Sequence, residues 1–185
     1  MSVENSVELL KKEIQKPAGR VMFSSTTEPY LDPCMARHAL EVLLDSHHYI
    51  LIITKRADVI KDLDILHGRD NVEVGFSITG LDDRAVKRWE PSAPPVSKRI
   101  EAAEMLHDAG VKTYASVEPW IPDVTSPLEI VQNLDGIFDR WIIGAMNYMH
   151  LDHHQYLPEL KETILWLDEQ RKPYYLKKEL QQLLC

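Results

Sequence analysis

Short apolar runs alternate with amphipathic segments along almost the whole chain, and this alternation constrains the fold more than any other feature. The runs are rich in β-branched and aromatic residues and have the length of strands buried on both faces. They occupy residues 20–25, 49–54, 72–78, 111–117 and 139–145, and a weaker sixth run covers 173–177. The order αβαβαβαβαβα predicts right-handed crossovers and a parallel sheet covered by helices.

The segments between these runs carry the signals of helices. Apolar residues recur there at i, i+3, i+4 and i+7, which places them on one helical face. Gly110 is positioned to end one helix in a left-handed cap, and Ser126 opens a capping box with Pro127 at the first helical position. The predicted helices cover residues 9–14, 36–44, 59–66, 102–109, 126–134 and 157–167.

The composition indicates a single globular domain over residues 1–185. Hydrophobic residues make up 44% of the chain and charged residues 27%, which excludes a disordered chain. No apolar run approaches the roughly 18 residues that a membrane span needs, so no membrane partner is expected. The sequence shows no secretory signal and has two cysteines, so we expect a cytoplasmic protein.

The charge distribution argues against nucleic acid as a partner of this chain alone. The formal net charge is −8, which repels a phosphate backbone at long range. Two segments are nevertheless basic, one around residues 11–20 and one around residues 84–99, where Arg84, Lys87, Arg88, Lys98 and Arg99 lie. We interpret both as solvated helix faces.

Two architectures accommodate the predicted order of elements, an open doubly wound sheet and an arc cut from a β/α barrel. A complete eight-stranded barrel usually needs about 250 residues, more than the 185 present. In both architectures ligands bind beyond the carboxyl ends of the strands. A ligand site is therefore expected among the residues that end or follow the strands.

Hydroxyls, an ammonium group and a carboxylate occupy these positions. Ser25 ends the first run and Thr26 follows it, Lys55 follows the second run, Ser77 lies near the end of the third, and Glu118 follows the fourth. On one rim, the cation can bind a ligand carboxylate, while the hydroxyls and the acid can bind an amine or a ribose. An amino-acid-bearing nucleotide such as S-adenosylmethionine (SAM) requires this mixture of groups.

Two further features offer alternative chemistry. His150, His153 and His154 have a spacing that lets imidazoles share a metal ion on a helix, and an exposed polar turn is the simpler interpretation. Cys34 lies at the predicted start of a helix, where a thiol can be activated, although a small buried side chain is its commoner role. No Ser-His-Asp order, P-loop or glycine-rich dinucleotide motif is present in the sequence.

Taken in order, the strand-end residues resemble the radical SAM superfamily, in its spore photoproduct lyase-like branch. The most specific stretches are SSTTEPYLDP at 24–33, ITKR at 53–56, SIT at 77–79, and the block from Leu81 to Gly110 that includes EPSAP at 90–94. The resemblance runs from Leu9 to about Tyr148. It implies an α/β fold, a partial (β/α) TIM-type barrel of five to six parallel strands from which the first strand of the radical SAM barrel is missing.

The resemblance also implies roles for the strand-end residues toward SAM. Ser25 and Thr26 would lie near its methionyl group, and Lys55 would bind the methionyl carboxylate. Ser77 would lie in the ribose region, and the turn at Glu118 on the adenine side. Thr26 and Glu28, which both follow the first run, stand where relatives more often have aspartate. At Thr26 a neutral hydroxyl replaces a charge near the cationic amine.

The cluster motif of the superfamily has no counterpart among these residues. Three closely spaced cysteines hold its iron–sulfur cluster, and this sequence has Cys34 and Cys185. A [4Fe-4S] cluster would therefore take its ligands from outside this chain. Phe23 occupies the position of the cysteine that donates hydrogen in spore photoproduct lyase, which argues against repair of thymine dimers.

Two functions follow from these observations. The first is a truncated or split radical SAM core domain that binds SAM and is inactive without a cluster-bearing segment. The alternative is a degenerate, non-catalytic barrel that binds a nucleotide or a protein. The resemblance leaves the strand at 20–25 with an unpaired edge, which predicts a homodimer or a pairing with the missing segment there.

Overall fold

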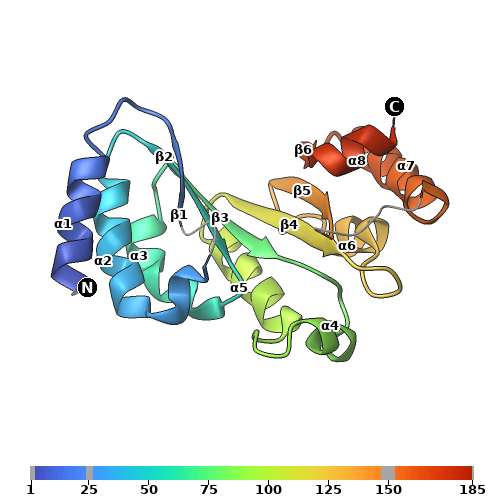
Figure 1. The fold of residues 1–185 in the computed structure, drawn as a ribbon, viewed down its shortest axis with the longest axis horizontal. Helices are drawn as coiled ribbons and strands as arrows, with labels where there is room; N and C mark the ends of the chain where they lie inside the picture. Colours follow the sequence, from blue (N-terminus) through green and yellow to red (C-terminus); the bar gives the residue numbers. More distant parts are fainter. Residues whose placement is uncertain (1–2, 24–26, 147–152, 185) are drawn as a thin grey trace.

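In the computed structural model the chain forms one parallel sheet whose six strands lie in sequence order from β1 to β6. The structure describes residues 3–23, 27–146 and 153–184. Because no strand crosses back over an earlier one, the sheet curls in a single direction into a half-barrel (Figure 1). A doubly wound sheet would reverse its strand order at a switch point. The strands are β1 (Arg20–Phe23), β2 (Tyr49–Thr54), β3 (Val72–Ser77), β4 (Thr113–Trp120), β5 (Arg140–Ala145) and β6 (Tyr174–Leu176).

Helices cover the convex side of the half-barrel, and the two termini lie at opposite ends of the molecule (Figure 1). Each of the five crossovers between consecutive strands contains at least one α-helix, as is usual in a parallel sheet. The α-helices are α1 (Val3–Glu13), α2 (Pro33–Leu44), α3 (Leu63–Leu66), α4 (Asp83–Trp89), α5 (Val96–Asp108), α6 (Pro127–Asn133), α7 (His153–Glu169) and α8 (Lys178–Leu183), and two 3-10 helices, η1 (Pro29–Leu31) and η2 (Ala57–Asp62), add to them.

The two faces of the sheet have different environments. On β2, Ile50 and Ile52 are fully buried against the helices, whereas Ile53 is half-buried on the other, concave face. Successive side chains of a strand point to opposite faces, so every second residue reaches the concave side. Residues two apart on one strand therefore form vertical columns on that side, and the last of each column lies at the carboxyl end.

The local signals of the sequence are confirmed at the helix ends. Ser126 caps α6 by accepting a hydrogen bond from the backbone N–H of Glu129 at 3.2 Å. Gly110 follows α5 with φ of +79°, in the left-handed region that glycine adopts without a steric cost. The predicted helix at 59–66 is divided in the structure. Its first part belongs to the 3-10 helix η2, and its second part forms the single turn of α3.

Some expectations were wrong. The run at 111–117 is shifted, since β4 begins at Thr113 and continues through Trp120. The short helices α4 and α8 were not predicted, because neither has room for a full apolar stripe. The basic segment around 84–99 is not wholly a solvated face, since Arg99 is 0% exposed and anchored inside the fold. Within the described residues, no helix combines the length and the apolar character needed to cross a membrane.

Candidate functional site

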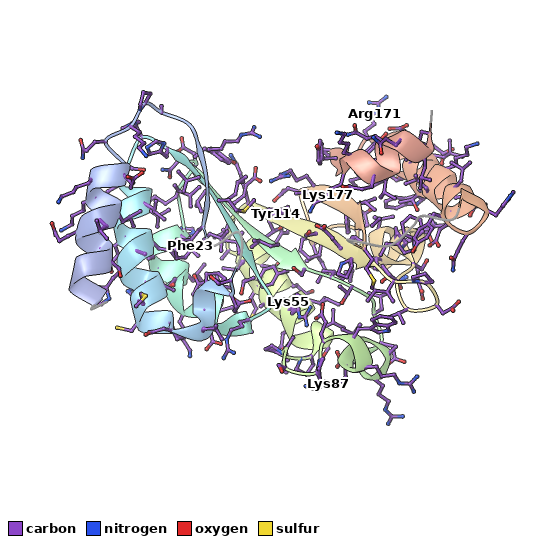
Figure 2. The ribbon with its side chains drawn as sticks, in the orientation of Figure 1. Phe23, Lys55, Lys87, Tyr114, Arg171 and Lys177 are labelled. Carbon is purple, nitrogen blue, oxygen red and sulfur yellow. The ribbon has the colours of Figure 1, made fainter. Side chains whose placement is uncertain are left out.

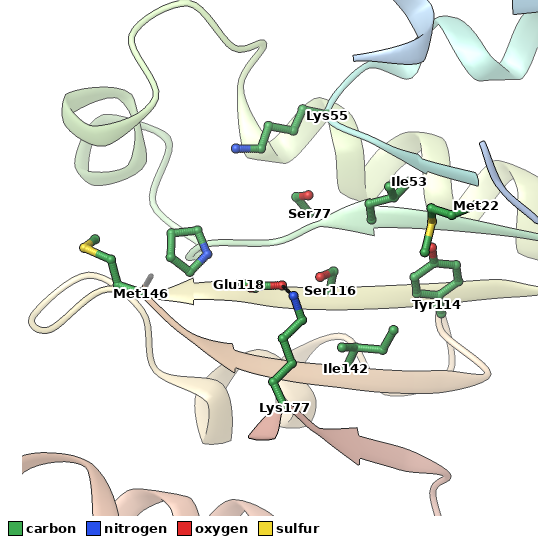
Figure 3. Close-up of a pocket in the computed structure, with 11 residues that line it drawn as sticks. Met22, Ile53, Lys55, Ser77, Tyr114, Ser116, Glu118, Ile142, Met146 and Lys177 are labelled. Carbon is green, nitrogen blue, oxygen red and sulfur yellow. Dashed lines mark ion pairs between the residues drawn. The ribbon is translucent and has the colours of Figure 1, made fainter. Parts of the chain in front are cut away.

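A cavity of about 560 Å³ opens on the concave face, at the carboxyl ends of the strands (Figure 3). Polar groups at the carboxyl ends of the strands line its mouth together with Pro119 and Met146, and mainly apolar side chains lie further down the strands. The lining comes from several strands and the loops after them, and comprises Met22, Ile53, Lys55, Ser77, Tyr114, Ser116, Glu118, Pro119, Ile142, Met146 and Lys177.

Three of the five predicted site residues line this one cavity. Lys55 follows β2, Ser77 ends β3, and Glu118 belongs to β4. They lie together because neighbouring parallel strands bring their carboxyl ends to the same edge and because each residue points to the concave face. Ser25 and Thr26 lie outside the described residues.

The Lys55 ammonium group is held at the rim by the carboxylate of Glu90, the residue that directly follows α4. Nζ of Lys55 donates to Oε1 of Glu90 at 2.6 Å, and the Lys55 side chain remains 35% exposed. Figure 2 shows Lys55 between the ends of the strands and α4. Glu90 itself is largely enclosed, with 8% of its side chain exposed.

Behind Glu90 lies the fully buried guanidinium group of Arg99, on α5. Its Nη2 donates to Oε2 of Glu90 at 2.5 Å and to the carbonyl of Pro94 at 2.9 Å, and its Nη1 donates to the carbonyl of Ser77 at 2.9 Å. Burial raises the pKa of Glu90, but the hydrogen bond from Lys55 and the charge of Arg99 outweigh it, so that the pKa lies below its usual value. Glu90 is therefore an ionised carboxylate between two cations.

A second ion pair crosses the opposite wall. Glu118 on β4 pairs with Lys177, which follows β6, so the pair spans the intervening strand β5 (Figure 3). Gly144 on β5 lies beneath it, and a Cβ atom there would come within 2.8 Å of Cδ of Lys177 and 3.0 Å of Cδ of Glu118. The glycine thus makes room for the contact. The peptide bond from Glu118 to Pro119 is cis.

The floor of the cavity is the ring of Tyr114. Its hydroxyl donates to the carbonyl of Ile52 at 2.8 Å, across the intervening strand β3. Beneath the ring, Arg140 lies 4.3 Å from the ring centroid and pairs with Glu73 at 2.5 Å. The charges of Arg140 and Glu73 are thus compensated within the fold.

Glu28, which the sequence places among the strand-end groups, is used by the fold itself. Its Oε1 accepts from the backbone N–H of Tyr30 at 3.1 Å and from Oγ1 of Thr54 at 2.5 Å. Its Oε2 accepts from the backbone N–H of Lys55 at 2.8 Å. The carboxylate fastens the loop after β1 to the end of β2, directly beside the Lys55 side chain.

The cavity contains residues that sequence reasoning did not select. Ser116 lies two positions before Glu118 and so shares its face, and this period of two was a signal for it. Lys177 is the last residue of the weakest predicted run, and its contact with Glu118 on β4 depends on the curl of the sheet. Glu90 and Arg99 belong to a block with a recognisable motif, but no local pattern showed that their side chains meet.

The described residues do not fit an iron–sulfur cluster. Cys34 is exposed on α2 and does not line the cavity, so its interpretation as a small buried side chain was wrong. Among residues 3–23, 27–146 and 153–184, no group of three or more histidine, cysteine, aspartate or glutamate side chains could hold a metal ion. His150, and the side chain of His153, are not described, so the histidine hypothesis is not tested.

The site is therefore a ligand-sized cavity at the carboxyl ends of a parallel half-barrel. No known family profile matches the chain. The chain is 32% identical over 125 residues to "Uncharacterized protein MJ0683" of Methanocaldococcus jannaschii, covering 65% of this chain and 47% of that protein. It is 33% identical over 156 residues to "Uncharacterized protein ORF301" of Acidianus two-tailed virus, covering 79% and 50%. The chain thus spans about half the length of the curated relatives it matches.

Two solved structures share the fold. SuiB of Streptococcus suis, bound to S-adenosylmethionine, superimposes with a TM-score of 0.68 at 11% identity, over 96% of this chain and 44% of that chain. Spore photoproduct lyase in complex with a dinucleoside spore photoproduct gives a TM-score of 0.64 at 16% identity, over 95% and 66%. These likenesses establish the half-barrel as the same core fold.

Proposed function

We propose that this chain is the SAM-binding part of a radical SAM protein of the spore photoproduct lyase-like branch. The observation that carries the proposal is that Lys55, Ser77 and Glu118, selected from sequence on three strands, line one cavity. The shared fold with SAM-bound SuiB and with spore photoproduct lyase supports it. The motif order in the sequence supports it independently.

The groups at the rim fit the chemistry of SAM. The methionyl carboxylate needs a cation, which Lys55 supplies from a position that is one-third exposed. The ribose hydroxyls need small polar partners, and Ser77 and Ser116 lie side by side on β3 and β4. Glu118 accepts hydrogen bonds and suits the amino group of adenine. Ser25 and Thr26 are proposed to complete the site near the methionyl group.

The cluster that cleaves SAM in this superfamily is proposed to come from another polypeptide segment. Such a cluster supplies the electron that cleaves bound SAM, and three or four thiolates usually hold it. The outer edge of β1 is where that segment would pair, because β1 pairs with β2 on one side and, among the described residues, with no strand on the other. The scarcity of cysteine is consistent with a reducing compartment such as the cytoplasm.

The experiment is a titration of the isotopically labelled protein with SAM, followed by NMR. We expect chemical-shift changes confined to the carboxyl ends of the strands and the residues that follow them. The affinity should fall at least tenfold in Lys55→Met, because a charged hydrogen bond contributes about 1.5–3 kcal/mol. SAM that lacks the carboxylate should bind the wild type and Lys55→Met equally.

Lys112→Met is the matched control, since Lys112 directly precedes β4 at the opposite end of the strands. It should leave SAM binding unchanged. Shifts that scatter over the convex helices, or an unaltered affinity in Lys55→Met, would contradict the assignment. Binding of a different nucleotide but not of SAM would instead support the degenerate, non-catalytic barrel.

A further inference from the structure

The two oxygens of the Glu90 carboxylate have separate sets of partners. Oε1 accepts from Nζ of Lys55 at 2.6 Å and from Oγ1 of Thr79 at 3.2 Å, whereas Oε2 accepts from Arg99. Thr79 and Arg99 are both 0% exposed. Lys55 is therefore the one exposed member of this set of three donors.

This division has an energetic consequence for Lys55. A buried carboxylate that loses its cation is usually left as an uncompensated charge, at a large cost. Glu90 differs, because departure of Lys55 leaves Arg99 on Oε2 and Thr79 on Oε1. Each oxygen keeps a donor and the carboxylate keeps a counter-charge.

Arg99 is fixed in a way that makes it a permanent partner. Besides Glu90, its guanidinium group donates to the carbonyls of Ser77 and Pro94, both at 2.9 Å. The bond to Ser77 joins α5 to the end of β3, at the cavity wall. Arg99 cannot follow a ligand without giving up these contacts, whereas Lys55 has a flexible four-carbon stem and a partly exposed ammonium group.

We propose that Glu90 is a positioning residue that holds Lys55 at the rim in the ligand-free protein and releases it to an anionic group of the ligand. Arg99 lowers the free-energy cost of this exchange, because it continues to pair with the Glu90 carboxylate after Lys55 leaves. The release step rests on the proposed function, in which the anionic group is the methionyl carboxylate. The holding step concerns the free protein and does not depend on SAM.

The holding step is tested by labelling lysines with an amine-reactive reagent and measuring each site by mass spectrometry. Glu90→Gln retains the shape of the side chain and an acceptor for Thr79, but removes the charge that holds Lys55. Labelling of Lys55, relative to the exposed Lys161 on α7, should rise at least threefold. An unchanged ratio overturns the proposal.

The matched control is Glu101→Gln, which breaks the exposed pair between Glu101 and Lys98 on α5. It makes the same chemical change near the surface, and Lys55 labelling should not alter. Glu90→Asp is the second variant, in case Glu90→Gln does not fold, because it keeps the charge for Arg99 and withdraws from Lys55. Its Lys55 ratio should fall between those of the wild type and Glu90→Gln, and a ratio equal to wild type counts against the proposal.

SAM binding by the same variants tests the release step. Glu90→Gln should bind SAM three- to tenfold more tightly, because the ligand carboxylate no longer displaces Glu90 from Lys55. A residue that merely supports the wall would instead weaken binding when changed, and weaker binding overturns the exchange. If the wild type and the variant both fail to bind SAM, the proposed function and the release step fail with it, while the labelling ratio still decides the holding step.

Discussion

The ring of Tyr114 lies directly over Gly75, so closely that a Cβ atom on Gly75 would come within 2.1 Å of its Cζ atom. The two residues are paired neighbours on β3 and β4. The missing side chain lets the phenol extend over β3 to the carbonyl of Ile52 on β2. A backbone position thus determines where the floor of the cavity lies.

Gly75→Ala should therefore destabilise the fold strongly. The added methyl group meets a buried ring that is 1% exposed, so it must displace the ring or the strand, at a cost of about 1–3 kcal/mol or more. Urea unfolding measures the change. Gly19→Ala is the control, since its added Cβ would meet nothing closer than 3.9 Å, and equal losses in the two variants would show that packing against Tyr114 is unimportant.

Removal of the buried guanidinium group should be among the most damaging changes in the chain. Arg99→Met leaves Lys55 as the cation that still pairs with Glu90, and it removes a donor from the carbonyls of Ser77 and Pro94. We expect a loss of about 3–5 kcal/mol in the free energy of unfolding. Arg84→Met, on the exposed side of α4, should change it by less than about 0.5 kcal/mol.

Glu90 and Arg99 should also be coupled. The double variant Glu90→Met with Arg99→Met removes both charges, so it should lose less stability than the sum of the single changes. Additive losses, within about 0.5 kcal/mol, would mean that the two charges do not compensate each other.

The stability of the protein should depend on pH through Glu90. Its pKa is lower in the folded state than in the unfolded chain, so its contribution is present above the unfolded value of about 4.3 and is lost as the pH falls through the folded value. The difference in unfolding free energy between the wild type and Glu90→Gln should shrink as the pH is lowered from 6 toward 3. If the difference instead grew on acidification, the pKa of Glu90 would be raised and not lowered by folding.

Lys177→Met tests the second ion pair. Because 42% of the Lys177 side chain is exposed, loss of the pair should change stability by less than about 1 kcal/mol. SAM binding should strengthen about threefold, since Glu118 no longer has to leave Lys177. Lys178→Met, on the neighbouring exposed residue, should change neither property, and a weaker affinity in Lys177→Met would argue that Lys177 contacts the ligand itself.

Sequence reasoning located the parts of the site that depend on strand periodicity. Lys55, Ser77 and Glu118 could be selected because the end of a parallel strand has a fixed position and a fixed face. Strand limits were less accurate, as at β4, because the register of neighbouring strands sets them. Ser25 and Thr26 lie outside the described residues, and the SAM-binding roles of all five residues remain predictions.

The residues behind the rim could not be predicted in the same way. The contact of Glu90 with Lys55 joins residues that are 35 positions apart, through the path of α4 and α5. The sequence predicts Arg99 to be a surface charge, because the spacing of apolar residues on a helix does not reveal which basic residue meets a buried carboxylate. The distinction depends on tertiary packing, which has no local period.

The two glycines of the concave face have a consequence for the evolution of this domain. Gly75 lets a side chain of β4 reach β2, and Gly144 lets one reach Lys177 beyond β5. A contact between two strands that are not neighbours therefore depends on a glycine in the strand between them. Among homologues, a residue larger than glycine at position 75 should occur only with a smaller residue at position 114. A larger residue at position 144 should occur only with shorter residues at positions 118 and 177, so these positions should covary.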